Sequence, residues 1–195
     1  MLYRFSKNLM TSALIAVPLA AGAVPAMAAE YKLDPAHSFI VFKIKHLGFS
    51  WLVGRFNSFD GTIEYDPETG PESQSISVTI DAASLDTNHA ERDKHLRSDD
   101  FFNVSEYPTV TFESTGYEGD ETGGTLSGEL TFLGVTKPIS FEVRKVGEGA
   151  DPWGGYRAGF EGSYTMTRGD FGMDYDLGPA SRTVEIDLYV EGIRQ

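Results

Sequence analysis

Hydrophobic and polar residues alternate along most of the chain. In residues 38–46, for example, Ile40, Phe42 and Ile44 share one parity while Lys43 and Lys45 occupy the other. A period of two, with β-branched and aromatic residues, predicts a strand that has one apolar face and one wet face. Eight segments follow this pattern, separated by clusters of Gly, Pro, Asp and Asn. They are residues 38–46, 53–65, 76–81, 107–117, 126–132, 139–143, 156–168 and 184–190.

Residues 88–97 break the alternation and contain neither Gly nor Pro. Asn88 is a residue type that caps helix N-termini, and Glu91 three residues later completes a capping box. Asp93 precedes Arg97 by four residues, which is the favourable order for an ion pair along a helix. This segment therefore predicts one short helix between the third and fourth strands.

An apolar parity shared by many strands must be buried, either between two sheets or inside a barrel. The segments 53–65, 107–117 and 156–168 are longer than an ordinary strand of ~5–6 residues. Long strands in sequential order favour an up-and-down arrangement, so we expect an all-β protein built as an eight-stranded antiparallel barrel. Such a barrel is either filled by its own side chains or holds one small ligand. The periodicity alone does not distinguish the two.

The residues expected to line the interior are mostly apolar and aromatic. Gly61, Gly128 and Gly162 share the inward parity, and they either leave room for a ligand or ease the bending of strands. If the interior holds a ligand, its binding site is lined by Ile40, Phe42, Ile44, Ile63, Val78, Ile80, Phe112, Leu130, Phe132, Phe141, Phe160, Ile186 and Leu188.

The composition narrows the range of partners and chemistry. The chain has 29 acidic and 16 basic residues, a formal net charge of −13, and no cysteine. So acidic a protein repels phosphate backbones and anionic headgroups, which argues against nucleic-acid binding and peripheral membrane attachment. The lack of cysteine excludes disulfides, thiol nucleophiles and thiolate metal sites.

The N-terminal segment has the features of a secretory signal peptide. Two basic residues precede an apolar run over residues 9–23, and Ala-Met-Ala at 26–28 offers small residues for cleavage. A retained membrane anchor is the alternative, but the run is shorter than the ~20 apolar residues of a spanning helix. We therefore expect removal of residues 1–28, which leaves residues 29–195 as one exported domain without stable membrane insertion.

The histidines are poorly spaced for a metal site. His89 and His95 are six residues apart and so lie on opposite sides of a helix, whereas zinc pairs are spaced by three or four. His37 and His46 flank one strand at its opposite ends. No serine lies in a Gly-x-Ser-x-Gly motif, and no pair of carboxylates stands out as a general acid and base. We expect neither a metal site nor an enzyme.

Arg92, Lys94 and Arg97 form a basic cluster in the predicted helix. One interpretation is a polar gate at the barrel mouth, where Arg92 and Arg97 contact the headgroup of an amphiphile. The interpretation that we favour is that the cluster pairs with nearby acidic residues and anchors the helix to the barrel rim. These acidic residues are Glu91, Asp93, Asp99 and Asp100.

Six stretches of the chain resemble motifs of the YceI-like family. They are His37-Ser38, His46-Leu47-Gly48, the helix segment 86–98, Phe101-Phe102 followed by Tyr107-Pro108, the hairpin 134–138, and Asp170-Phe171 followed by residues 177–181. The helix motif is long and unusual in composition, and the resemblance covers essentially the whole chain after residue 28.

The resemblance implies a lipocalin-like barrel, exported to the periplasm, whose internal tunnel binds a polyisoprenoid or an isoprenoid quinone. The lipid is a non-covalent ligand, no covalent cofactor is implied, and no catalytic residue carries over. Stress response is a role suggested for the family. A lipid-modifying enzyme and a structural or interaction barrel without lipid are the alternatives, and a homodimer is compatible with each of them.

Overall fold

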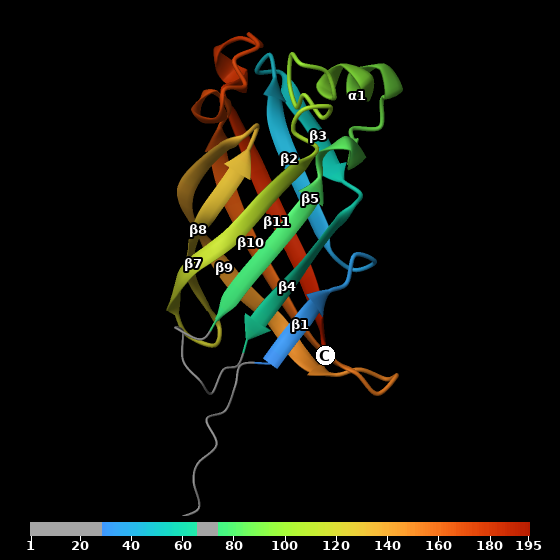
Figure 1. The fold of residues 1–195 in the computed structure, drawn as a ribbon, viewed down its shortest axis with the longest axis vertical. Coiled ribbons are helices and arrows are strands. Elements are labelled where there is room, and N and C mark those ends of the chain that lie inside the picture. Colours follow the sequence, from blue (N-terminus) through green and yellow to red (C-terminus); the bar gives the residue numbers. More distant parts are fainter. Residues whose placement is uncertain (1–28, 66–73) are drawn as a thin grey trace, which may run out of the picture.

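The computed structural model describes residues 29–65 and 74–195 as one antiparallel sheet that closes into a barrel (Figure 1). The predicted signal peptide, residues 1–28, lies outside the described residues. In the described part, no helix is long and apolar enough to cross a membrane. The strands are β1 (Ala29–Leu33), β2 (Phe39–His46), β3 (Ser50–Phe56), β4 (Phe59–Tyr65), β5 (Ser75–Asp81), β6 (Leu85–Asp86), β7 (Thr109–Gly119), β8 (Gly123–Phe132), β9 (Val135–Ala150), β10 (Tyr156–Thr167) and β11 (Thr183–Arg194).

Eight strands form the closed ring, in the order β1-β4-β5-β7-β8-β9-β10-β11, and pairing of β11 with β1 completes it. β1 and β2 share one position beside β11, since β1 pairs with Gly192–Arg194 and β2 with Val184–Tyr189. The prediction of an eight-stranded antiparallel barrel is confirmed. The eight predicted segments omit β1, although its five residues also alternate between apolar and polar side chains.

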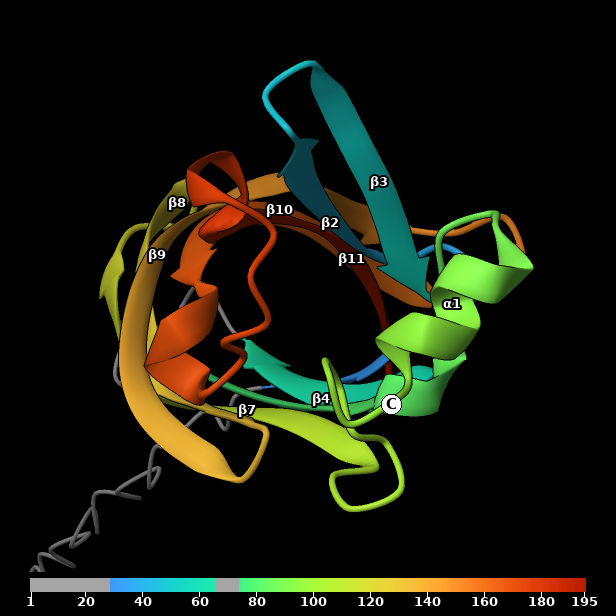
Figure 2. The same ribbon diagram turned by 90° about the horizontal axis from the view of Figure 1, so that it is seen from above.

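The prediction of a single strand over residues 53–65 is wrong. β3 and β4 are separated at Asn57 and Ser58, whose backbone N–H groups donate to the carbonyl and hydroxyl oxygens of Ser84 at 3.2 and 3.0 Å. These bonds turn the chain, so that β4 joins the ring while β3 pairs with β2 and, at its end, with β6. The β2–β3 hairpin therefore projects outside the ring of strands (Figure 2).

Helix α1 (Ala90–Leu96) forms where the sequence predicts it, but its cap differs. His89 is the N-cap, and its Nδ1 accepts the N–H of Arg92 at 3.2 Å. Asn88 instead adopts a left-handed conformation with φ of 60°. The carboxylate of Asp86 accepts the N–H of Asn88 at 2.8 Å, so the chain turns one residue before the helix can start.

Within the described residues there are three short 3-10 helices: η2 (Ala82–Ser84), η3 (Arg168–Phe171) and η4 (Pro179–Ser181). η3 and η4 belong to the β10–β11 segment, residues 168–182. This segment and α1 lie over the same end of the barrel (Figures 1 and 2).

The hydrophobic core has two parts. One cluster, with Phe132 and Phe171 among its buried members, lies toward the end covered by α1 and the β10–β11 segment. The other includes Tyr31, Ile63 and Ala158, toward the opposite end. A core divided in this way leaves the middle of the barrel to side chains that contact both parts, such as Ile186.

Candidate binding cavity

A cavity of about 900 Å³ runs along the inside of the barrel. Its wall includes β7 residues from Val110, near one end of that strand, to Tyr117, near the other. At 3.3 Å per residue these positions are separated by about 23 Å of strand. The volume lies toward the upper end of the range for small-molecule sites in proteins, roughly 300–1,000 Å³. The question that periodicity leaves open is thus answered, because the interior is hollow.

All thirteen side chains predicted to line the interior lie in the wall of this cavity. They come from seven ring strands and from β2, so residues far apart in sequence share one surface. Leu126, Ile139, Val143 and Val190 add to the apolar wall. That these side chains contact a bound ligand stays a prediction.

Only one of the three inward glycines, Gly162, faces the cavity. The ring of Phe112 covers Gly128, and a Cβ atom at position 128 would also lie 2.6 Å from a backbone oxygen of β7. A Cβ atom at position 61 would lie 2.4 Å from the backbone oxygen of Ser77 on β5. The interpretation that Gly61 and Gly128 leave room for a ligand is therefore wrong, since neighbouring side chains and backbone fill that space.

One end of the cavity carries a cation. The Nζ of Lys145 donates a hydrogen bond to the hydroxyl oxygen of Tyr65 at 3.1 Å and lies 3.6 Å from a carboxylate oxygen of Glu148. Burial by itself would lower the pKa of Lys145, but the bond to Tyr65 and the charge of Glu148 raise it on balance. Burial also raises the pKa of Tyr65. At neutral pH the pair is therefore an ammonium group and a neutral phenol, both able to contact a polar headgroup.

The alternation of inward and outward residues predicts that Lys145 points into the cavity, but it does not predict this for Tyr117. Lys145 has the same inward parity as Val143 on β9 and lies two residues after the predicted strand 139–143. Tyr117 also lies in the wall, although its parity is opposite to that of Phe112. A β-bulge after Ser114 shifts the register of β7 and β8 and so exchanges the faces.

Arg92 and Arg97, predicted for the mouth of the barrel, are both held by uncharged acceptors. Arg92 lies in the cavity wall, and its Nε and Nη2 donate to the hydroxyl and carbonyl oxygens of Thr87 at 2.7 and 2.6 Å. Arg97 lies outside the wall and donates to the carbonyl oxygens of Ala83 and Leu85 at 2.8 and 2.5 Å. Both arginines anchor α1 to the barrel rim, but through Thr87 and backbone carbonyls rather than through the nearby acidic residues.

The predicted ion pair of Asp93 and Arg97 is not formed. Asp93 is buried, and one of its carboxylate oxygens accepts the N–H and the hydroxyl of Thr87 at 3.0 and 2.5 Å. A buried carboxylate requires such donors, whereas an exposed helical ion pair is worth only about 0.3–0.5 kcal/mol. The buried contact with Thr87, six residues earlier in the chain, therefore determines the side-chain position.

Arg168 holds the β10–β11 segment over the cavity. Its buried guanidinium donates to the carbonyl oxygens of Ser181, Met173 and Tyr175 at 2.8, 3.3 and 3.1 Å. Burial lowers the pKa of Arg168, but an arginine keeps its charge in proteins. The hydroxyl of Ser181 in turn donates to the carbonyl oxygen of Lys45 at 2.6 Å, which ties the segment to β2. Arg168 continues the inward parity of Met166 at the end of the predicted strand, but periodicity does not indicate which carbonyl groups it binds.

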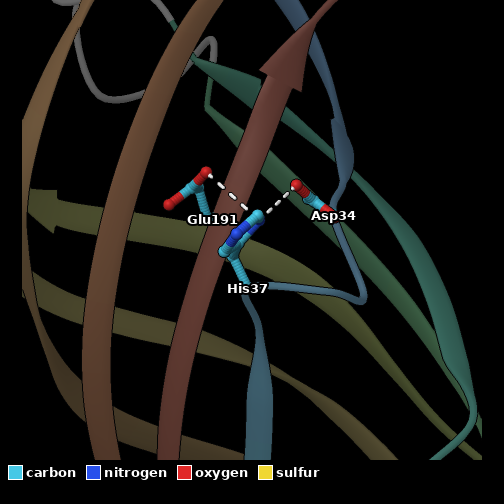
Figure 3. A group of neighbouring side chains, drawn as sticks. All are labelled: Asp34, His37 and Glu191. Carbon is cyan, nitrogen blue, oxygen red and sulfur yellow. Dashed lines mark hydrogen bonds and ion pairs between the residues drawn. The ribbon is translucent and has the colours of Figure 1, made fainter. Parts of the chain in front are cut away.

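Asp34, His37 and Glu191 converge outside the cavity (Figure 3). The Nδ1 of His37 lies 2.8 Å from an oxygen of Asp34 and 4.0 Å from an oxygen of Glu191. Among the described residues, this group alone has ligand atoms spaced closely enough for a metal ion. However, Nη1 of Arg157 donates to both carboxylates and so occupies the oxygens that would bind a metal ion. We therefore keep the prediction that the protein has no metal site.

We expect acid to destabilise the protein through Asp34. Hydrogen bonds from His37 and Arg157 lower the pKa of Asp34 to about 2, below the ~3.9 of an unfolded chain. Such a carboxyl contributes stability that is fully present above the unfolded value and is lost as the pH falls through the folded value. The free energy of unfolding should thus decrease by roughly 2 kcal/mol between pH ~4 and ~2.

Urea unfolding across this pH range measures the effect. The difference in stability between the wild type and Asp34→Asn should shrink as the pH falls. Asp60→Asn is the matched control, because the Asp60 side chain is 68% exposed. Parallel pH profiles for the wild type and Asp34→Asn would contradict the assignment.

The family follows from comparison with known proteins. Residues 31–192 match the model of the YceI-like domain. The chain belongs to the YceI-like family. A UPF0312 protein of Pseudomonas aeruginosa is 58% identical over 172 residues, which cover 87% of this chain and 90% of that protein. The resemblance inferred from the sequence motifs is thereby confirmed.

Solved structures of YceI-like barrels have the same fold. A YceI protein of Campylobacter jejuni superimposes with a TM-score of 0.70 at 33% identity, covering 78% of this chain and 91% of that one. A polyisoprenoid binding domain from Saccharophagus degradans, implicated in plant cell wall breakdown, has a TM-score of 0.64 at 18% identity. The match covers 86% of this chain and 99% of that domain, and it shows a common fold.

Proposed function

We propose that this YceI-like protein carries or stores a long isoprenoid lipid, a polyisoprenoid or an isoprenoid quinone, inside its barrel. The observation that carries the proposal is the cavity of about 900 Å³, which extends along the barrel between apolar and aromatic side chains. The fold shared with the polyisoprenoid binding domain of Saccharophagus degradans supports it.

Burial of an apolar chain supplies the affinity in this proposal. Each buried CH₂ group contributes ~0.8 kcal/mol, so about ten of them match the ~8 kcal/mol of micromolar binding. Length and width of the cavity then select the ligand, while its headgroup contacts either Lys145 with Tyr65 at one end or Arg92 at the other.

Binding, rather than catalysis, is the role that we propose. The charged groups Lys145 and Arg92 lie at the two ends, and Tyr164, beside Ile186, brings a phenol whose pKa is raised by burial, so it is a poor proton donor at neutral pH. The protein would act in the periplasm after removal of residues 1–28, with no covalent cofactor, in the setting of a stress response. A barrel without ligand is less favoured, because its interior would be left hollow.

Solvent extraction and mass spectrometry of the protein, purified without detergent, test this proposal. We expect an isoprenoid lipid in the extract, and uptake of a long-chain ubiquinone by protein that has been stripped of lipid. If neither retention nor uptake is found, the proposal is wrong. A changed mass of the lipid after incubation with the protein would favour the enzymatic alternative.

A further inference from the structure

The β2–β3 hairpin carries exposed apolar side chains close to the cavity. Phe49 is 87% and Leu47 is 61% exposed, and Trp51 and Val53 follow along β3 at 41% and 50%. The hairpin projects from the ring (Figure 2), and among the described strands β3 has no second partner before Arg55. A group of apolar side chains exposed together marks an interaction surface.

The turn of the hairpin presents Leu47 in an unfavourable backbone conformation. Leu47 and Gly48 have φ angles of 52° and 82°, the two positive values of a type I′ turn. Asn, Asp or Gly is usual at the first of these positions, because a branched side chain is strained there. The exposed Leu47 side chain gains little from packing within the chain, so we attribute its presence to a contact outside it.

The hairpin is also locally basic. No Asp or Glu lies between Asp34 and Asp60, although the chain contains 29 acidic residues. Two carboxylates of β11 neutralise Lys43 at 3.3 and 3.0 Å. The Nζ of Lys45 instead lies 3.7 Å from the centre of the Trp51 ring, and no described carboxylate pairs with it. A cation and an exposed aromatic ring thus stand side by side.

The base of the hairpin is continuous with the cavity. Lys45, His46 and Leu47 belong to the cavity wall. They lie at the end of the barrel covered by α1 and the β10–β11 segment (Figure 1). Whatever binds the turn therefore lies next to this end of the cavity.

We propose that the hairpin tip, residues 47–51, docks reversibly on an anionic lipid bilayer and holds this end of the cavity against it. The inference rests on the proposed function and deepens it, because it names the surface where the lipid enters. Leu47 and Phe49 would enter the boundary between headgroups and acyl chains, Trp51 would lie at the interface, and anionic headgroups would attract Lys45.

Charge favours a bilayer over a second copy of the chain. Two hairpins brought together would place their cations side by side, with no acidic residue between positions 34 and 60 to neutralise them. The net charge of −13 opposes adsorption of the molecule as a whole. Contact is therefore confined to the tip, and an isoprenoid chain could pass from the bilayer into the cavity with little exposure to water.

Flotation of the lipid-stripped protein with vesicles of phosphatidylethanolamine and phosphatidylglycerol, free of isoprenoids, tests the inference. The wild type should float with these vesicles and bind less at high salt, because salt screens the attraction. The variant Phe49→Ser/Trp51→Ser, which leaves the cavity wall unchanged, should bind about tenfold more weakly. Its melting temperature should be retained, because both side chains are exposed.

Trp153→Ser is the matched control. Trp153 is 81% exposed, but it lies in the β9–β10 connection at the opposite end of the barrel (Figure 1). This variant should bind vesicles like the wild type. Equal binding by all three proteins, absence of wild-type binding, or dimerisation that is lost in the double variant without any vesicle binding would each overturn the inference.

Uptake of a long-chain ubiquinone presented in detergent separates this inference from the proposed function. The double variant should load normally from detergent but slowly from vesicles. Vesicle binding without any loading would refute the proposed function alone, and normal loading with unchanged vesicle binding in the double variant would refute the docking surface alone.

Discussion

Val78→Trp should abolish most lipid retention while leaving the protein folded. Val78 lies at the middle of β5 with its side chain in the cavity wall, so a larger ring enters space that we assign to the lipid. Displacing even two CH₂ groups costs the ligand about 1.6 kcal/mol, which is roughly tenfold in affinity. Retention of a long-chain ubiquinone and the melting temperature are measured on the same sample.

Thr79→Trp is the control, because Thr79 is the next residue on the same strand and its side chain is exposed on the outer face. It should retain lipid like the wild type. A solid interior would instead make Val78→Trp overpack, at a cost of about 1–3 kcal/mol. A strongly lowered melting temperature in Val78→Trp would therefore contradict a ligand cavity, and unchanged retention would contradict the assigned path of the lipid.

Arg168→Met should destabilise the protein by about 3 kcal/mol, because two buried carbonyl oxygens and one partly buried carbonyl oxygen lose their donors. Replacing a buried ion pair by apolar residues is often harmless, since both charges are then removed. Here the acceptors are backbone groups, which remain after the substitution. For a domain of this size the melting temperature should fall by roughly 6–12 °C, and bound lipid should be released faster because Arg168 holds the segment that covers one end of the cavity.

The control for Arg168→Met is Arg182→Met. Arg182 ends the same segment, but its side chain is exposed. Thermal unfolding of both variants, with the rate of ubiquinone transfer to acceptor vesicles, separates a specific role of Arg168 from a general effect of charge. Similar melting temperatures for the two variants would contradict the proposal that Arg168 holds the β10–β11 segment in place.

The candidate cavity was readable from the sequence where the strands are regular. Parity places Phe42, Val78 and Phe141 on the inner face because it is a local property of an extended chain and closure into a ring preserves it. Where a strand is irregular, this inference fails. The β-bulge after Ser114 brings Tyr117 inward, and the turn at Asn57, held by Ser84 some 27 positions later, breaks the predicted strand.

The helix illustrates the same limit for polar residues. Its position follows from the missing alternation. The sequence also predicts a capping box of Asn88 with Glu91 and an ion pair of Asp93 with Arg97. Yet Asp86 and Thr87, from the chain before the helix, take the roles that decide its start and the position of Asp93. Both sets of partners are near in sequence, and burial decides between them, because a desolvated carboxylate gains more from a second donor than an exposed one does.

By itself, the sequence determined the all-β class, the antiparallel barrel, the helix position and the inward face of each regular strand, since all of these follow from periodicity over short distances. Only the tertiary structure decided that the barrel is hollow, that Phe112 fills the space beside Gly128, and that Tyr117 turns into the cavity. The physical reason is that interior volume depends on strand number, tilt and stagger together with the side chains of every strand. The interior volume therefore cannot be inferred from any single segment of the chain.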